Sequence, residues 1–235
     1  MPADVAGFAM APSGVEIGIM AARQPLQNRV TPFGEIVAVP ERGMFMGNRG
    51  CLHNGRKELT RRSWTTTRWI TCVLEFKERR REVMRPGYYT ELFFLDEATA
   101  FAAGHRPCAE CRRDDYNRFL ELWRLVHGGD RRPLADEVDA ELHRQRVTDT
   151  KDQRRWSSSL DELPSGTMVA RKDAPQSALL WDGGRLWGWS PGGYTEAATM
   201  AGDTEVDVLT PPSIVRVFAA GYEPAVHNSR FTSAG

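Results

Sequence analysis

The chain has 235 residues and equal numbers of basic and acidic side chains, 31 Lys+Arg against 31 Asp+Glu, so its total charge does not indicate a partner. Hydrophobic residues make up 41% and charged residues 26%, a balance that excludes a disordered chain, a coiled coil and a collagen-like repeat. The longest apolar runs are far shorter than the ~20 residues of a membrane span, and the first 22 residues lack the basic start of a secretory signal. We therefore expect a cytoplasmic protein without a membrane partner.

Charge is unevenly distributed along the chain. Residues 42–85 carry twelve Lys/Arg against four Asp/Glu, whereas residues 161–235 carry five against nine. This split indicates a polyanionic partner for the first of these regions.

The N-terminal half predicts short strands followed by helices. Asp96 is typical of a helix N-cap and Gly104 of a helix end, so a short helix is expected between them. Apolar residues three and four positions apart predict an amphipathic helix over 113–127, and another helix is expected over 134–146. The strands, predicted from β-branched and aromatic residues, are 34–39, 68–76 and 88–95.

The C-terminal part predicts a β-rich region. Asp182-Gly183-Gly184 is typical of a tight hairpin turn, and a helix is expected over 213–221. An aromatic cluster surrounds this hairpin and can serve either as the core of a small barrel or as a stacking platform. Its members are Trp181, Trp187, Trp189 and Tyr194. The predicted strands are 167–170, 178–181, 185–189 and 205–209.

Four cysteines suggest a metal site, because a reducing compartment disfavours disulfides. Cys108-Ala-Glu-Cys111 has the spacing at which two thiolates reach one zinc ion, although a redox dithiol is the rival interpretation. Structural zinc takes four ligands, and the candidates for the remaining two are Cys51, Cys72 and His53. Cys72 lies on a predicted strand and can equally be a buried thiol. Cys51 and His53 lie in a glycine-rich loop, 42–53, whose simplest explanation is a loop shaped around the metal.

The segment before the Cys-x-x-Cys pair combines basic and aromatic residues. Such side chains neutralise phosphates and stack on bases, so we expect a nucleic-acid-binding face here. The alternative is a solvated hairpin turn. The candidate residues are Arg61, Arg62, Trp64, Arg68, Lys77, Arg79, Arg80 and Arg81.

The run from Phe93 to Cys111 resembles the zinc-binding module of the bacterial Ada alkylation-repair family. The shared pattern is an aromatic strand, Glu-Ala, a short helix, Ala-Gly and then Arg-Pro-Cys-x-x-Cys. The resemblance implies a small zinc-nucleated fold that contacts DNA. In that family a cysteine of an N-terminal Cys-x3-Cys pair accepts a methyl group, and this sequence lacks the pair. Stand-alone relatives use a His and a Cys instead, which keeps His53 among the candidates.

Together these patterns predict an α+β protein in which a small zinc-nucleated mixed sheet with helices is followed by a β-rich C-terminal region. We expect it to bind zinc and to contact DNA, with a role in DNA repair or processing. The alternatives are a metal-dependent enzyme on DNA, by methyl acceptance or by hydrolysis with His53 beside Asn54 or Glu58, and a protein-binding adaptor with structural zinc. The expected organisation is a loose N-terminus (1–22), the zinc-binding module with flanking helices (23–148), a linker (149–159), the β-rich region (160–228) and a tail (229–235).

Overall fold

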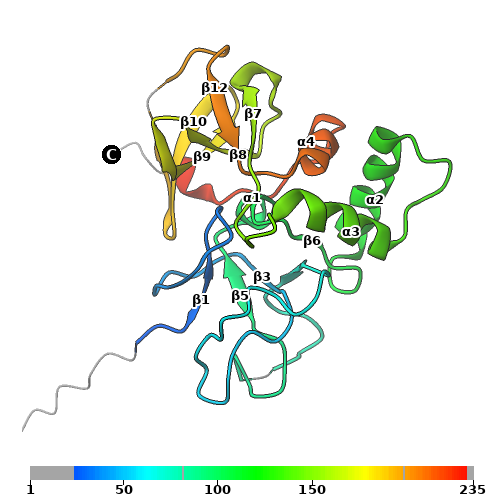
Figure 1. Cartoon of the computed structure of the whole chain (residues 1–235), viewed down its shortest axis with the longest axis vertical. Coiled ribbons are helices and arrows are strands. Elements are labelled where there is room, and N and C mark those ends of the chain that lie inside the picture. The colour runs from blue at the N-terminus through cyan, green and yellow to red at the C-terminus, as the bar shows by residue number, and fades with distance from the viewer. Residues whose placement is uncertain (1–23, 81, 198, 232–235) are drawn as a thin grey trace, which may run out of the picture.

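The N-terminal half of the chain builds a mixed six-stranded sheet (Figure 1). The structure, a computed structural model, describes residues 24–80, 82–197 and 199–231. The strand order is β2-β1-β5-β3-β4-β6, in which β1–β5 and β4–β6 are parallel pairs. The strands are β1 (Gln27–Val30), β2 (Ile36–Ala38), β3 (Phe45–Asn48), β4 (Ile70–Val73), β5 (Leu92–Phe94) and β6 (Arg106–Pro107). The three strands predicted for this half are present in shorter form, whereas β1, β3 and β6 have no counterpart in the sequence patterns.

Strand β3 lies inside the glycine-rich segment whose composition predicts a loop. A Cβ atom on Gly47 would lie 2.2 Å from the carbonyl oxygen of Ile70, and one on Gly43 would lie 1.8 Å from that of Phe94. These two glycines therefore allow neighbouring backbones to approach closely, and they do not mark a turn.

The C-terminal part forms a second, antiparallel six-stranded sheet, ordered β11-β10-β9-β8-β12-β7. Gly183 and Gly184 form the two-residue hairpin turn predicted here, both with positive φ (58° and 77°). The strands are β7 (Trp156–Ser159), β8 (Thr167–Arg171), β9 (Ala174–Asp182), β10 (Arg185–Ser190), β11 (Gly193–Glu196) and β12 (Glu205–Val208). The predicted α+β class, with a mixed sheet and helices followed by a β-rich region, is confirmed.

Helix α1 (Glu97–Ala102) lies between the two sheets in Figure 1, and all six of its residues are buried. Asp96 caps it as predicted, because its Oδ1 accepts a hydrogen bond from the backbone N–H of Thr99 at 2.8 Å. Ala100 packs on the first sheet and Ala98 on the second, so the helix joins the two cores.

The first turn of α1 also holds the C-terminal segment. Glu97 accepts hydrogen bonds from the Tyr222 hydroxyl at 2.8 Å and from the backbone N–H of Ala225 at 2.9 Å. The same carboxylate pairs with the buried Arg112 guanidinium at 2.5 Å. Burial raises the pKa of Glu97, and the Arg112 charge opposes this rise. Residues more than 120 positions apart therefore share one buried polar cluster.

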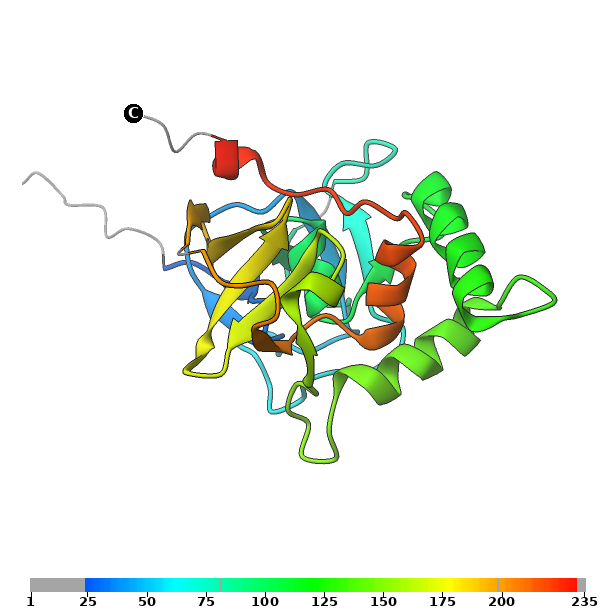
Figure 2. The ribbon, with the colours of Figure 1, turned by 90° about the horizontal axis from the view of Figure 1, so that it is seen from above.

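Three further helices cover one side of α1, and Figure 2 shows them side by side as the green α2 and α3 and the orange-red α4. Phe101 of α1 packs edge to face on Phe218 of α4 with ring centroids 5.2 Å apart. The predicted helical stripe on 113–127 is buried here. The helices are α2 (Arg113–His127), α3 (Ala135–Arg146) and α4 (Pro212–Ala219). Among the described residues, no helix is long and apolar enough to span a membrane.

The aromatic cluster of the C-terminal region packs inward. Trp189 donates its indole N–H to the Thr99 hydroxyl at 3.0 Å, and the Tyr194 hydroxyl donates to Asp96 at 2.8 Å. Of the two readings that the sequence leaves open, the structure favours a core role for these rings.

The expected linker and the expected tail both contain residues with regular secondary structure. Residues 156–159 of the expected linker form β7, one of the two edge strands of the second sheet. Residues 229–231 of the expected tail belong to the 3-10 helix η2 (Asn228–Phe231), and a second such turn is η1 (Leu160–Glu162). The expected loose N-terminus, 1–22, lies outside the described residues.

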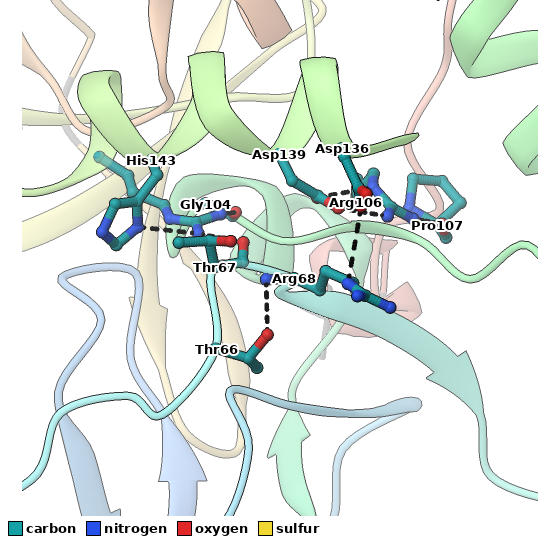
Figure 3. A network of polar contacts seen from close by, with 10 residues as sticks. Thr66, Thr67, Arg68, Gly104, Arg106, Pro107, Asp136, Asp139 and His143 are labelled. Carbon is teal, nitrogen blue, oxygen red and sulfur yellow. Dashed lines mark hydrogen bonds and ion pairs between the residues drawn. The ribbon is translucent and has the colours of Figure 1, made fainter. Parts of the chain in front are cut away.

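Two ion pairs join α3 to Arg106 of β6 and to Arg68, which precedes β4, and they differ in burial (Figure 3). Asp139 accepts two hydrogen bonds from Arg106, at 2.8 and 2.6 Å, and both side chains are less than 5% exposed. Asp136 lies one turn earlier and 3.6 Å from Arg68, with both side chains more than two-thirds exposed.

Asp139→Asn is expected to lower the free energy of unfolding by about 3–5 kcal/mol, because it leaves the Arg106 charge buried and unpaired. Asp136→Asn is the matched control and should cost less than about 1 kcal/mol. Urea unfolding followed by circular dichroism measures both values. Equal losses in the two variants would contradict this account.

Candidate metal centre

Strand β4 presents Cys72 on the face of the first sheet opposite α1. Side chains alternate along a strand, and here Trp69 and Thr71 are buried while Ile70 and Cys72 are only partly covered. Cys72 therefore points away from the core and is open to a ligand.

The Cys-x-x-Cys pair reaches Cys72 through the parallel pairing of β6 with β4. The N–H of Cys108 donates to the carbonyl oxygen of Thr71 at 2.9 Å, which fixes the turn beside the strand. The N–H of Glu110 points at Cys108 Sγ at 3.4 Å. As a result, the Sγ atoms of Cys72, Cys108 and Cys111 all lie within 4.8 Å of one another.

The three thiols influence one another's protonation. A hydrogen bond from Cys72 and the N–H groups of the turn lower the pKa of Cys108 to about 5, against the effect of burial. The same partner lowers the pKa of Cys111. The pKa of Cys72 is raised, by its hydrogen bonds to the other two sulfurs and by burial. The two cysteines of the turn therefore favour the thiolate form more than Cys72 does.

A cavity of about 800 Å³ opens beside the thiol cluster. Its walls include Met46, Ile70 and Phe93 from three strands of the first sheet, and Arg79 and Glu110 lie beside the sulfurs as an ion pair. The cavity is of the size that holds a small organic ligand. Its lining residues are dispersed along the chain, so no local motif could have identified them.

Cys51 and His53 are not brought to this cluster. Both ring nitrogens of His53 have partners, Nδ1 with the Thr90 hydroxyl at 2.7 Å and Nε2 with the Arg85 carbonyl at 3.2 Å. Cys51 Sγ lies 3.8 Å from the carbonyl oxygen of His53. In the described part of the chain, the three-cysteine group is the one set of three or more such donors close enough for a metal.

Four of the eight predicted nucleic-acid residues line one of two cavities. Arg79 lines the thiol cavity, whereas Arg61, Arg62 and Trp64 line a second one. Arg68 forms the exposed pair with Asp136 described above. Lys77, which stacks on Phe76, and Arg80 are exposed, and Arg81 lies outside the described residues.

In the metal-free protein, Cys108 is expected to react with iodoacetamide half-maximally near pH 5, because its lowered pKa keeps it a thiolate above that pH. Reactivity should fall as the pH drops through this value and the thiolate gains a proton. Peptide mapping by mass spectrometry follows the reaction. In urea the midpoint should return to about 8.5, the value of a free cysteine. A folded-state midpoint above pH 8 would be inconsistent with the geometry.

Comparisons with known proteins give no identity to set beside this geometry. No family model, no curated protein and no solved structure matches the chain. What the structure itself supports is a three-cysteine cluster able to hold a metal ion such as zinc.

Proposed function

We propose that this chain is a zinc-binding protein whose metal is held by Cys72, Cys108 and Cys111 at the wall of the 800 Å³ cavity. The observation that carries the proposal is the convergence of three sulfur atoms within 4.8 Å, from segments more than 30 residues apart. Thiolates are the ligands that select zinc among the common divalent metals.

The donor set fits zinc in charge and in number. The pKa values of Cys108 and Cys111 are lowered, which favours the thiolate form that binds a metal, whereas the pKa of Cys72 is raised, so binding would displace a proton from Cys72. Three protein donors are the number of an open zinc site, one fewer than in closed structural sites. When bound, zinc supplies a Lewis acid at the cavity wall.

Arg79 and Glu110, which form an exposed ion pair, also line this cavity, so one cation and one anion face a ligand that binds there. The finer assignment, a protein of DNA repair or processing, is supported by the resemblance over Phe93–Cys111. The cysteine set differs from the four cysteines of the Ada family, so methyl transfer is not part of the proposal.

Purified protein should contain about one zinc ion per chain, and Cys72→Ser, Cys108→Ser and Cys111→Ser should each lose it, because each removes one of only three donors. Elemental analysis after dialysis gives the zinc content. Cys51→Ser and His53→Ala are the matched controls and should retain the metal. Zinc retained by all three cluster variants, or lost equally from Cys51→Ser, would refute the proposed ligand set.

Nucleic-acid binding is the second candidate function, and one observation favours it. Arg61, Arg62 and Trp64 gather on the wall of the second cavity, together with Lys151 and Arg155. Cations around an aromatic side chain form the type of surface that binds the backbone and bases of a nucleic acid. Arg61 and Arg62 are exposed and therefore accessible to a phosphate backbone.

The double variant Arg61→Ala/Arg62→Ala is expected to reduce the salt dependence of duplex DNA binding by about two units of log Kd per log salt, since each phosphate contact contributes ~0.9. Fluorescence anisotropy at several ionic strengths measures the slope. Arg185→Ala/Arg216→Ala, two exposed cations of the C-terminal half, is the charge-matched control and should leave it unchanged. No binding by the wild type, or equal slopes in both variants, would favour the adaptor alternative.

A further inference from the structure

A second cavity, of about 530 Å³, lies on the other side of the first sheet and shares no lining residue with the thiol cavity among the described residues. Successive side chains of an extended chain point to opposite faces of a sheet. Accordingly, Trp69 lines the second cavity and the next residue, Ile70, lines the thiol cavity. Six cationic side chains line this second cavity, against the acidic Glu35 and Asp152. The six are Arg49, Arg61, Arg62, Arg146, Lys151 and Arg155.

Two of these cations, Arg49 and Arg146, are almost completely buried, with 3% and 2% exposed. Their guanidinium carbons lie over the indole of Trp69, 4.2 and 3.8 Å from its centroid. The tight fit of Arg146 depends on Gly104, because a Cβ there would lie 2.5 Å from the Arg146 Cδ. Two charged groups therefore share one aromatic ring at the inner wall of the cavity.

Among the residues that the structure describes, no carboxylate forms a hydrogen bond with either guanidinium. Arg49 donates Nη1 to the carbonyl of Gly34 at 2.9 Å, and Arg146 donates to the carbonyls of Gly104 and Thr67 at 2.8 and 2.6 Å. Within the described part of the chain, Arg49 Nη2 and Arg146 Nε have no hydrogen-bond partner. The nearby Asp139 is already held by two hydrogen bonds from Arg106.

The electrostatic cost of this arrangement is large. Burial lowers the pKa of Arg49 to about 9, and burial together with the Arg49 charge lowers the pKa of Arg146 to about 8. His105 lies 3.4 Å from Arg49, and its pKa is lowered well below the usual value by burial and both arginines, so it stays neutral. A buried charge is stabilised by an anion, and a guanidinium fork matches the oxygens of a phosphate.

We propose that this cavity binds a phosphate group, held by Arg49 and Arg146 at the inner wall and by Arg61 and Arg62 at the exposed rim. The volume of about 530 Å³ accommodates a ligand of mononucleotide size. The phosphate belongs either to a free nucleotide or to the end of a nucleic-acid strand, and its recognition is the same in both cases. The site does not depend on the zinc centre. It shares the two rim arginines with the nucleic-acid candidate, and inorganic phosphate tests the pocket by itself.

Calorimetric titration of the intact protein with inorganic phosphate, at ionic strength fixed with chloride, is expected to show one site. Arg146→Met should weaken phosphate binding at least about ten-fold, because it removes a buried charge partner. Arg144→Gln, an exposed cation two residues along the same helix, is the matched control and should bind within about two-fold of wild type.

Two further titrants identify the source of the phosphate. Tighter binding of dAMP than of inorganic phosphate supports a nucleotide ligand. At least about ten-fold tighter binding of a 5′-phosphorylated oligo-dT than of its unphosphorylated form supports a strand end.

Circular dichroism establishes whether Arg146→Met folds. If it does not, the exposed rim variant Arg61→Ala/Arg62→Ala replaces it and should weaken phosphate binding about three-fold or more. The proposal is overturned if phosphate gives no more heat than chloride at equal ionic strength. Wild-type phosphate affinity in a folded Arg146→Met protein, or in the rim variant when Arg146→Met is unfolded, would overturn it as well.

Discussion

The burial of helix α1 is the constraint on which the rest of the structure depends. Six residues are too few to form a stable helix in water, so α1 exists because the two sheets and the other helices enclose it. Helix α1 is followed by Gly104, where the chain turns towards β6. The register of β6 with β4 then places Cys108 beside Cys72. The three-cysteine cluster is therefore positioned by packing that lies outside it.

The sequence predicts two of the three clustered cysteines, because their spacing is local, but it cannot predict a contact that depends on strand pairing. Cys108 and Cys111 are recognisable because Cys-x-x-Cys is a spacing typical of zinc ligands. No such spacing distinguishes Cys72, Cys51 and His53, so the sequence leaves all three as candidates for the remaining ligands. Only the parallel pairing of β4 with β6, which is a non-local contact between short strands, places Cys72 with the pair and leaves the other two outside.

The same limit applies to the fold. Strongly periodic elements such as α2, and turn signals such as Gly183-Gly184, are local and are found correctly. Strand β3 is hidden because Gly47 has the composition of a loop and the role of a spacer between backbones. Arg49 and Arg146 show the same limit for a candidate binding site. Their guanidinium groups meet over one tryptophan only after the 96 residues between them have folded.

The contact of Glu97 with Tyr222 and Ala225 has a consequence for dissecting the protein. A fragment cut between the two sheets would leave this carboxylate, and the arginine bound to it, with an incomplete set of partners in a desolvated site. The half that carries the three-cysteine cluster and the β-rich half are accordingly interdependent in folding. Each should aggregate when expressed alone and recover when the complementary piece is co-produced.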